Sequence, residues 1–185
     1  MKFEEKIKLS KKGKKITFKM LVKENAKEVL ETMANVAETS PFILRSAEEF
    51  RNTSIEEEEK WIENQNNNDR GGAIAAFENE NLIGVLDFSA YKNIKMSHRA
   101  HLGIAIKKEY RGEGVGELFF NVLFSLLRNI PNLDRIELTV MGKNSIGKKL
   151  YEKMGFAVIG INPMAFKQSD GTFDDEIKMI KYLER

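Results

Sequence analysis

The stretch Tyr110-Arg111-Gly112-Glu113-Gly114-Val115-Gly116 is the most informative part of this sequence. It follows a strand-like run, Ala100 to Ile106, and it opens a segment whose apolar residues recur at helical spacing. A glycine-rich turn that leads into a helix exposes unpaired backbone N–H groups at the positive end of the helix dipole. Glycine lets the backbone approach a phosphate closely, and Arg111 adds a cation. The stretch therefore predicts a binding site for a phosphorylated ligand.

Two common phosphate-binding motifs do not fit these residues. The dinucleotide fingerprint requires G-x-G-x-x-G and an acidic residue about 20 positions later, whereas the glycines here are spaced as G-x-G-x-G. Asp134 lies near that distance, but it precedes the next predicted strand instead of ending one. The P-loop requires Lys and then Ser or Thr after its last glycine, and Gly116 is followed by Glu117. Both motifs are excluded.

Two further features resemble the GNAT superfamily of acetyl-coenzyme A-dependent N-acetyltransferases. Arg111, Gly114 and Gly116 read as R-x-x-G-x-G, which is similar to the family's pyrophosphate-binding motif. Downstream, the segment Asn144 to Phe156 resembles the family's N-x-x-A-x-x-L-Y-x-x-x-G-F helix, with Gly147 at the position of the usual alanine. A predicted strand, Arg135 to Met141, lies between the two motifs. The resemblance covers nearly the whole chain, from residue 16 to residue 183.

The hydrophobic pattern predicts an alternation of strands and helices. One helix carries the apolar stripe Val29, Leu30, Met33 and Val36 and is broken at Glu38 to Phe42, where Pro41 disfavours a helical conformation of the residue before it. Another helix runs from Ile55 to Asn66, with Ser54 and Glu57 as a capping box. Two more helices begin at Val115 and Asn144. Strands are predicted at 16–22, 73–78, 82–90, 100–106, 135–141, 156–166 and 173–183. The order β-α-α-β-β-β-α-β-α-β-β indicates a mixed α/β (α+β) fold, and the resemblance implies a twisted, largely antiparallel sheet of about seven strands.

The 185 residues are most simply a single N-acetyltransferase domain, 1–185, in which residues 1–15 form an N-terminal β-hairpin extension. The basic run Lys11-Lys12-Gly13-Lys14-Lys15 interrupts two segments of alternating apolar residues. This pattern favours a solvated hairpin turn over a binding patch.

Composition excludes several classes of function. The chain has no cysteine, which excludes disulfides, a thiol nucleophile and cysteine-ligated zinc. His98 and His101 would face opposite sides of an extended chain, so we expect no metal. The net charge of +2 gives no reason to invoke nucleic acid. No apolar run reaches about 18 residues and no signal-peptide core is present, so we expect no membrane partner and a cytoplasmic location.

The resemblance implies the residues that bind acetyl-CoA. The pyrophosphate would be held by the loop residues Arg111, Gly112, Glu113, Gly114, Val115 and Gly116. The backbone of Ile104, Ala105 and Ile106 would bind the pantetheine arm as an added strand does, in a notch where this strand parts from its neighbour. Asn144 would also contact that arm, and Lys148 lies on the same helix face as Asn144 and Tyr151. The bland alternative is that Asn144 only caps its helix.

The resemblance also implies Tyr151 as the general acid that protonates the leaving thiolate, since a phenol has a pKa near ~10. The alternative is that Tyr151 is only a half-buried aromatic. The general base remains open between His101, Glu38 and a chain of water molecules. We find no Gly-x-Ser-x-Gly elbow and no cysteine that could form an acyl-enzyme. Direct attack of the amine on acetyl-CoA in a ternary complex is therefore expected.

The acceptor stays open at this stage. The region Glu38 to Phe42 and the strand from Ala100 look like those of ribosomal-protein acetylases, which makes a protein N-terminus one plausible acceptor. A polyamine, an amino acid or an antibiotic fits equally well. Two other functions compete: a non-catalytic acyl-CoA-binding regulatory module of the same fold, and a protein for another phosphate ligand such as ATP or NAD. Dimerisation is common in the family, so a homodimer is compatible with the resemblance.

Overall fold

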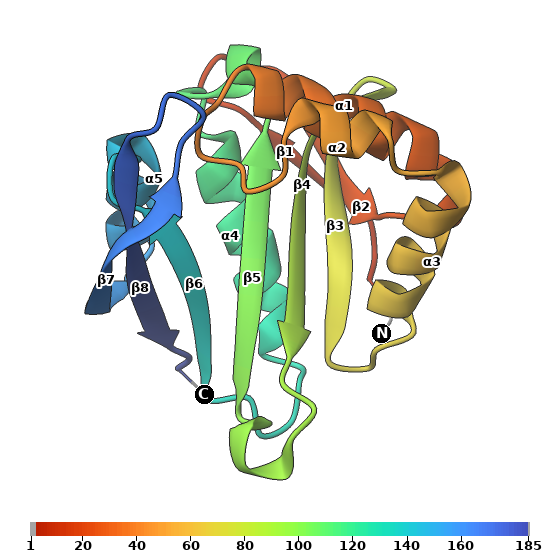
Figure 1. Cartoon of the computed structure of the whole chain (residues 1–185). Coiled ribbons are helices and arrows are strands. Elements are labelled where there is room, and N and C mark those ends of the chain that lie inside the picture. The colour runs from red at the N-terminus through yellow and green to blue at the C-terminus, as the bar shows by residue number, and fades with distance from the viewer. Residues whose placement is uncertain (1–2, 185) are drawn as a thin grey trace. The chain divides into compact units, whose positions relative to one another are not determined.

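The computed structural model describes residues 3–184, and Figure 1 labels its elements. The strands are β1 (Lys6–Leu9), β2 (Lys15–Met20), β3 (Gly71–Glu78), β4 (Asn81–Ala90), β5 (Arg99–Ile106), β6 (Arg135–Met141), β7 (Ala157–Lys167) and β8 (Phe173–Tyr182). The α-helices are α1 (Ala26–Glu38), α2 (Ala47–Arg51), α3 (Ile55–Asn66), α4 (Val115–Leu127) and α5 (Ser145–Lys153). These bounds confirm the predicted order of elements and add a short helix, α2; strand β1 is the first strand of the predicted N-terminal hairpin.

The sheet has eight strands in the order β1-β2-β3-β4-β5-β6-β8-β7. The pairs β1/β2, β2/β3, β3/β4, β6/β8 and β7/β8 are antiparallel, whereas β5 and β6 are parallel. The predicted mixed and largely antiparallel fold is therefore confirmed. The strand count exceeds the predicted seven because the N-terminal hairpin adds β1 to the edge formed by β2.

The chain divides into two compact units. The first comprises Met1–Ser89 and Gly103–Ile130, and the second comprises Ala90–Leu102 and Pro131–Arg185. Strand β5 contributes its last residues to the first unit and its first residues to the second. The single domain over 1–185 stays a prediction, and Met1, Lys2 and Arg185 lie outside the described residues.

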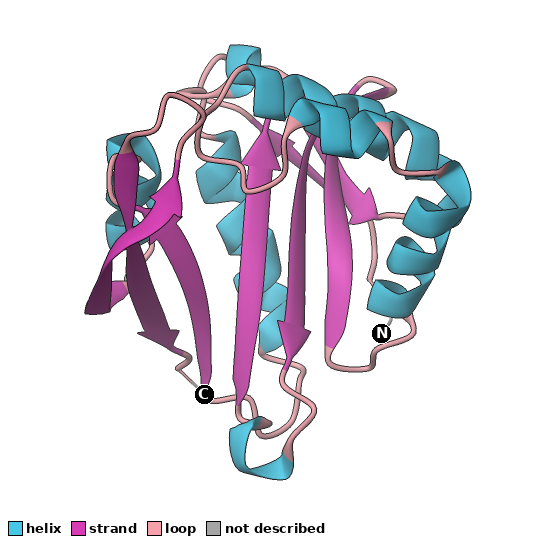
Figure 2. Cartoon of the chain, in the orientation of Figure 1, coloured by secondary structure: helices cyan, strands magenta, loops and turns pink. Residues whose placement is uncertain are grey.

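Strand β3 is the centre of the first unit's core. Its sequence is apolar almost throughout, as expected of a strand that is covered on both faces. Ala73, Ala75 and Phe77 belong to a buried cluster with residues of α1 and α3. On β2, Phe18 packs edge-to-face against Phe119 of α4, with ring centroids 5.0 Å apart. Figure 2 shows helices on both sides of these strands, so the core holds α4 and the loop before it in place.

Local capping signals explain where the helices of this unit begin. The Ser54 hydroxyl accepts a hydrogen bond from the Glu57 N–H, and the Glu57 carboxylate accepts one from the Ser54 N–H, which confirms the predicted capping box. The same box is formed by Ser46 and Glu49 at the start of α2, a helix that the hydrophobic pattern missed because it is only five residues long. Helix α1 ends at Glu38, at the break predicted from Pro41.

The second unit contains β6, β7, β8, the start of β5, and α5. Arg99, Ala100 and His101 of β5 pair with Arg135, Ile136 and Glu137 of β6. Arg99 adds a bidentate ion pair to the Glu137 carboxylate, with N–O distances of 2.8 Å to both oxygens. Strand β7 pairs with β8 and is exposed along most of its length. Within residues 3–184, no helix is long and apolar enough to cross a membrane.

Candidate active site

The glycine loop has the backbone that its sequence predicts. Gly112 and Gly114 adopt left-handed conformations, with φ of 76° and 84°, which residues with a side chain rarely adopt. Gly114 is also the N-cap of α4. A glycine N-cap lacks the oxygen that Ser, Thr, Asp or Asn would offer to the N–H groups of the first turn. The first turn of α4 therefore has no side-chain cap at Gly114, and the helix dipole there favours an anion.

The end of β5, just before the loop, packs closely against β4. A Cβ on Gly84 of β4 would lie 2.7 Å from the carbonyl oxygen of Ala105, so the two strands approach closely here. The Lys107 N–H donates to the Ile83 carbonyl at 2.9 Å. Ile104 and Ile106 are half-buried on this stretch. All three predicted pantetheine-binding residues follow the last residue of the β5–β6 ladder, His101; the notch between the strands stays a prediction.

Arg111 makes hydrogen bonds within the protein. Its Nε donates to the Ile106 carbonyl at 2.9 Å, and its Nη1 donates to the Thr39 carbonyl at 3.4 Å. Burial lowers the pKa of the guanidinium below its ordinary value. In this conformation Arg111 braces the loop against the end of β5 and the residue after α1. Its contact with a phosphate stays a prediction.

Glu113 is the loop residue whose surroundings the sequence did not indicate. Its side chain is only 2% exposed, and its Oε1 accepts a hydrogen bond from Lys12 Nζ at 2.9 Å. Lys14 Nζ lies 3.4 Å from Oε2. These partners, the Lys12 hydrogen bond first, lower the pKa of the Glu113 carboxyl. The solvent-exposed hairpin turn is confirmed, and two of its lysines also contact the Glu113 carboxylate.

Tyr110 extends this polar cluster. Its hydroxyl donates to Glu78 Oε2 at 2.7 Å, and Lys14 Nζ lies 4.5 Å from the centre of its ring. Burial and the hydrogen bond to Glu78 raise the pKa of Tyr110 to about 12. The loop is thus anchored by side chains to the hairpin turn and to β3.

In the second unit, Asn144 caps α5 as predicted. Its Oδ1 accepts a hydrogen bond from the Gly147 N–H at 2.9 Å. A Cβ at position 147 would lie 2.7 Å from Asn144 Nδ2 and 2.9 Å from its Cγ. A Cβ at position 147 would therefore require the Asn144 side chain to shift.

Tyr151 is the buried residue of α5, at 8% exposure. Its ring contacts Phe156 edge-to-face at 6.1 Å, and burial raises its pKa to about 12. Leu150 and Met154 are only half-buried, so the aromatic ring of Tyr151 is more buried than either aliphatic neighbour. Lys148, one turn before Tyr151, is half-buried.

The two side chains predicted as general bases lie on different units. His101 is exposed on β5, with its ring 5.5 Å from that of Tyr91. Glu38, at the end of α1, forms an ion pair with Arg51 of α2. It also lines a pocket of about 400 Å³ between these helices, together with Lys27, Glu31 and Phe50. Among the described residues, no group of three or more His, Cys, Asp or Glu could hold a metal ion.

Comparisons with known proteins agree with the motifs. A model of the acetyltransferase (GNAT) family matches residues 33–156. The chain is 30% identical over 79 residues to L-amino acid N-acetyltransferase AaaT from Escherichia coli (strain K12). That alignment covers 43% of this chain and 49% of the relative. The chain spans about half the length of the curated relatives that it matches.

Solved structures share the fold over most of both chains. An acetyltransferase of the GNAT family from Streptococcus pneumoniae superposes with a TM-score of 0.85 at 24% identity, over 90% of this chain and 99% of that one. Ribosomal-protein-S5-alanine acetyltransferase from Vibrio fischeri gives 0.76 at 19% identity, over 91% and 93%. A phosphinothricin acetyltransferase from Sinorhizobium meliloti, in complex with acetyl-CoA, gives 0.78 at 17%, over 91% and 88%.

Proposed function

The chain belongs to the acetyltransferase (GNAT) family, and from that premise we propose that it transfers an acetyl group from acetyl-CoA to a primary amine. The glycine loop carries this proposal. Two left-handed glycines, Gly112 and Gly114, lead into an α-helix whose first N–H groups have no side-chain cap at Gly114. Backbone N–H groups at such a helix end suit the pyrophosphate of the coenzyme.

The proposed coenzyme contacts follow the family's motifs. The loop from Arg111 to Gly116 binds the pyrophosphate, and the backbone of Ile104 to Ile106 binds the pantetheine arm. Arg111 already donates to the Ile106 carbonyl, but a carbonyl oxygen has a second lone pair for the ligand. Asn144 and Lys148 contribute from α5. In this proposal Arg111 acts mainly by bracing the strand and the loop in one geometry.

The proposed reaction is direct attack. The amine nitrogen forms a bond to the thioester carbonyl carbon, the C–S bond breaks, and the proton that the nitrogen loses balances the one that the thiolate gains. No acyl-enzyme is needed, since the sequence contains no cysteine and no nucleophile elbow. The protein's main contribution is then to hold the two reactants in contact.

The raised pKa of Tyr151 argues against full proton transfer from its phenol to the leaving thiolate. Complete proton transfer from a phenol of pKa about 12 to a thiolate of pKa about 8.5 is uphill by roughly 3.5 units, or about 5 kcal/mol. The buried phenol nevertheless stays protonated at neutral pH and can donate a hydrogen bond to the sulfur as its charge develops. We therefore assign Tyr151 as a hydrogen-bond donor to the leaving group, with the net proton coming from the amine nitrogen after it has bonded to the carbonyl carbon.

The acceptor that we favour is an α-amino group. AaaT is by its name an L-amino acid N-acetyltransferase, and the Vibrio fischeri protein is by its name a ribosomal-protein alanine acetyltransferase. A peptide α-amino group has a pKa of about 7.7–8.0, so roughly a tenth of it is neutral at pH 7. Such an acceptor needs only a weak general base to remove its proton. His101 or a water chain fits that demand better than Glu38, whose carboxylate pairs with Arg51.

The alternative is a regulatory module of the same fold that binds an acyl-CoA without turnover. One experiment tests both functions: thermal unfolding with acetyl-CoA, with ATP and NAD as controls, followed by thiol release in the presence of peptide and small-molecule amines. A ligand at 100 times its Kd adds about 2.7 kcal/mol, or roughly 5–10 °C for a chain of this size. Stabilisation without thiol release for any amine supports the module, and stabilisation by ATP or NAD alone contradicts both functions.

A further inference from the structure

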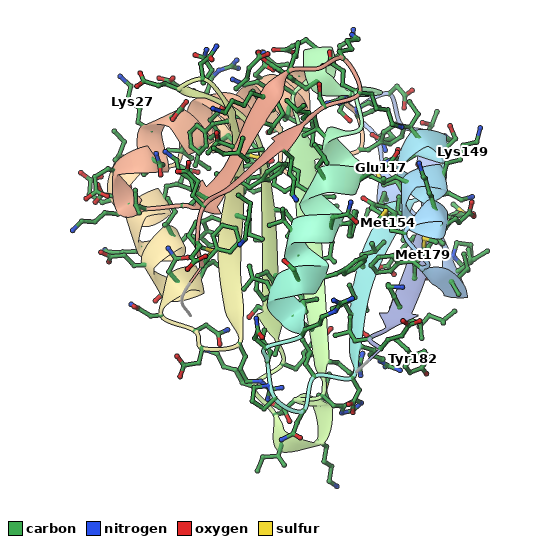
Figure 3. All side chains as sticks on the ribbon, turned by 180° about the vertical axis from the view of Figure 1, so that it is seen from behind. Lys27, Glu117, Lys149, Met154, Met179 and Tyr182 are labelled. Atoms are coloured by element: carbon green, nitrogen blue, oxygen red, sulfur yellow. The ribbon has the colours of Figure 1, made fainter. Side chains whose placement is uncertain are left out.

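The basic turn of the N-terminal hairpin lies against the glycine loop. The Lys11 N–H donates to the Glu113 carbonyl at 2.9 Å, and Lys12 and Lys14 surround the Glu113 carboxylate. Lys11 Nζ reaches the Glu117 carboxylate at 2.8 Å. Figure 3 labels Glu117 in the first turn of α4, beside which the hairpin passes. Three lysines from one turn thus contact the segment where an anion is expected to bind.

The loop needs these lysines to attract an anion. Segment 109–117 contains three glutamates and a single arginine, which gives it a formal charge of −2. The arginine is engaged with two backbone carbonyls. Adding the three lysines, together with the Glu78 carboxylate that lies 3.7 Å from Lys14 Nζ, brings the formal charge of the cluster to 0. Without them, a ligand with several phosphate charges would meet a repelling surface at the N-terminus of α4.

Lys12 and Lys14 act on the loop through Glu113. The carboxylate is nine-tenths or more buried, and its Oε2 accepts no hydrogen bond from the described residues, although Lys14 Nζ stands 3.4 Å away. A buried carboxylate without a counter-charge is costly and would place a negative charge inside the phosphate loop. The two lysines cancel that charge, which makes them positioning residues.

Lys11 is placed to contact the ligand itself. Its side chain is 59% exposed, and its stem lies over Gly114: a Cβ there would be 3.0–3.3 Å from Lys11 Cγ, Cδ and Cε. Its ion pair with Glu117 is partly exposed, and such pairs contribute little to stability. The ammonium can therefore exchange the Glu117 carboxylate for a phosphate at little cost.

We propose that Lys11, Lys12 and Lys14 of the hairpin turn are the basic half of the phosphate site, in which Lys11 binds a phosphate group of the coenzyme while Lys12 and Lys14 neutralise Glu113. This inference rests on the proposed function, because it takes acetyl-CoA as the ligand. The group that Lys11 binds is either the pyrophosphate of the coenzyme, which is a phosphate anhydride, or its 3′-phosphate, which is a phosphate ester.

The test compares Lys11→Ala with Lys15→Ala in the full chain. Lys15 is an exposed lysine of the same turn, so both variants lose the same charge, but only Lys11 lies on Gly114. Titration calorimetry with acetyl-CoA should show at least about a tenfold weaker Kd for Lys11→Ala, the loss expected of a charge-assisted hydrogen bond. Lys15→Ala should stay within about twofold of wild type. Thermal unfolding checks that both variants are folded.

A second ligand identifies the phosphate. If Lys11 binds the 3′-phosphate, its loss has no effect on the binding of 3′-dephospho-acetyl-CoA; if it binds the pyrophosphate, the same loss appears with both ligands. Equal affinities of Lys11→Ala and Lys15→Ala for acetyl-CoA would overturn the inference while leaving the proposed function intact. A wild-type chain that does not bind acetyl-CoA would overturn both.

The positioning role of Lys12 is tested separately, by the acetyl-CoA affinity of a single and a double variant. Lys12→Ala should weaken acetyl-CoA binding, and adding Glu113→Gln to it should restore the affinity, since the amide carries no charge to neutralise. A merely structural role for the Lys12–Glu113 hydrogen bond predicts the opposite, because the double variant also lacks that ion pair. Failure of Glu113→Gln to improve the Kd of Lys12→Ala would rule the role out.

Discussion

Two glycines of the phosphate loop have nearly the same backbone conformation but different surroundings, and alanine at each position separates backbone strain from packing. Gly112 and Gly114 have φ of 76° and 84°. A Cβ at Gly112 would meet nothing within 4 Å, whereas a Cβ at Gly114 would lie 3.0 Å from Lys11 Cγ. Both alanines must adopt a left-handed conformation, which costs about 1–2 kcal/mol. Only the second must also displace the hairpin's lysine.

We therefore expect Gly112→Ala to lower the free energy of unfolding by about 1–2 kcal/mol, and Gly114→Ala to lower it by roughly a further 0.5–1 kcal/mol as the Lys11 stem leaves its rotamer. For a chain of this size each 1 kcal/mol corresponds to about 2–4 °C in Tm. Urea unfolding at fixed pH measures both values. Adding Lys11→Ala to Gly114→Ala should bring its cost close to that of Gly112→Ala, whereas Lys11→Ala on the Gly112→Ala background should change little.

The reasoning is refuted if the two single variants are equally destabilised and Lys11→Ala has the same effect in both backgrounds. That result would mean that the hairpin does not pack on Gly114 in solution. Acetyl-CoA titration of the same variants adds a second reading. A larger residue such as Leu at position 114 should abolish binding, because it displaces Lys11 and also obstructs the N-terminus of α4.

Three further substitutions test separate parts of the proposal. Tyr151→Phe should lower kcat by roughly 10- to 100-fold, since one hydrogen bond to the leaving group is lost, with the Kd for acetyl-CoA nearly unchanged; equal losses in both would contradict the donor role. Asn144→Ala should lower stability by about 1 kcal/mol through loss of the α5 cap, measured by urea unfolding, and an unchanged midpoint would mean that the cap is dispensable. Because the folded-state pKa of Glu113 is lowered from 4.5, its charge stabilises the fold above that pH and the gain is lost as pH falls through the lowered pKa. The stability difference between wild type and Glu113→Gln should accordingly shrink in acid below pH ~4.5, and a difference that is constant from pH 7 to pH 3 would refute it.

The order of elements followed from the sequence because its signals are local. Apolar residues at helical spacing after Gly114 predicted α4, the Ser54–Glu57 box predicted the start of α3, and Pro41 predicted the end of α1. Each signal acts within one or two turns of chain, where hydrogen bonds and sterics decide the conformation. The left-handed glycines of the loop were predictable for the same reason.

Only the tertiary structure decided which side chains and charges surround the candidate site. The sequence predicted a cation at Arg111 and a solvated lysine turn; the fold adds that Arg111 has two carbonyl acceptors and that Lys12 and Lys14 lie against the Glu113 carboxylate. Lys12 and Glu113 are 101 residues apart, and nothing in either local sequence indicates that they pair. Likewise, Tyr151 is more buried than its aliphatic neighbours.

The sequence by itself therefore determined the family, the order of elements and the chain geometry of the phosphate loop, since these depend on short-range patterns and on motifs with fixed spacing. Only the tertiary structure decided which charges meet at that loop, which glycine is required by packing and which phenol is buried. Those properties depend on which distant segments the core brings together, and burial and pairing set the energy of a charge far more than its position in the chain does.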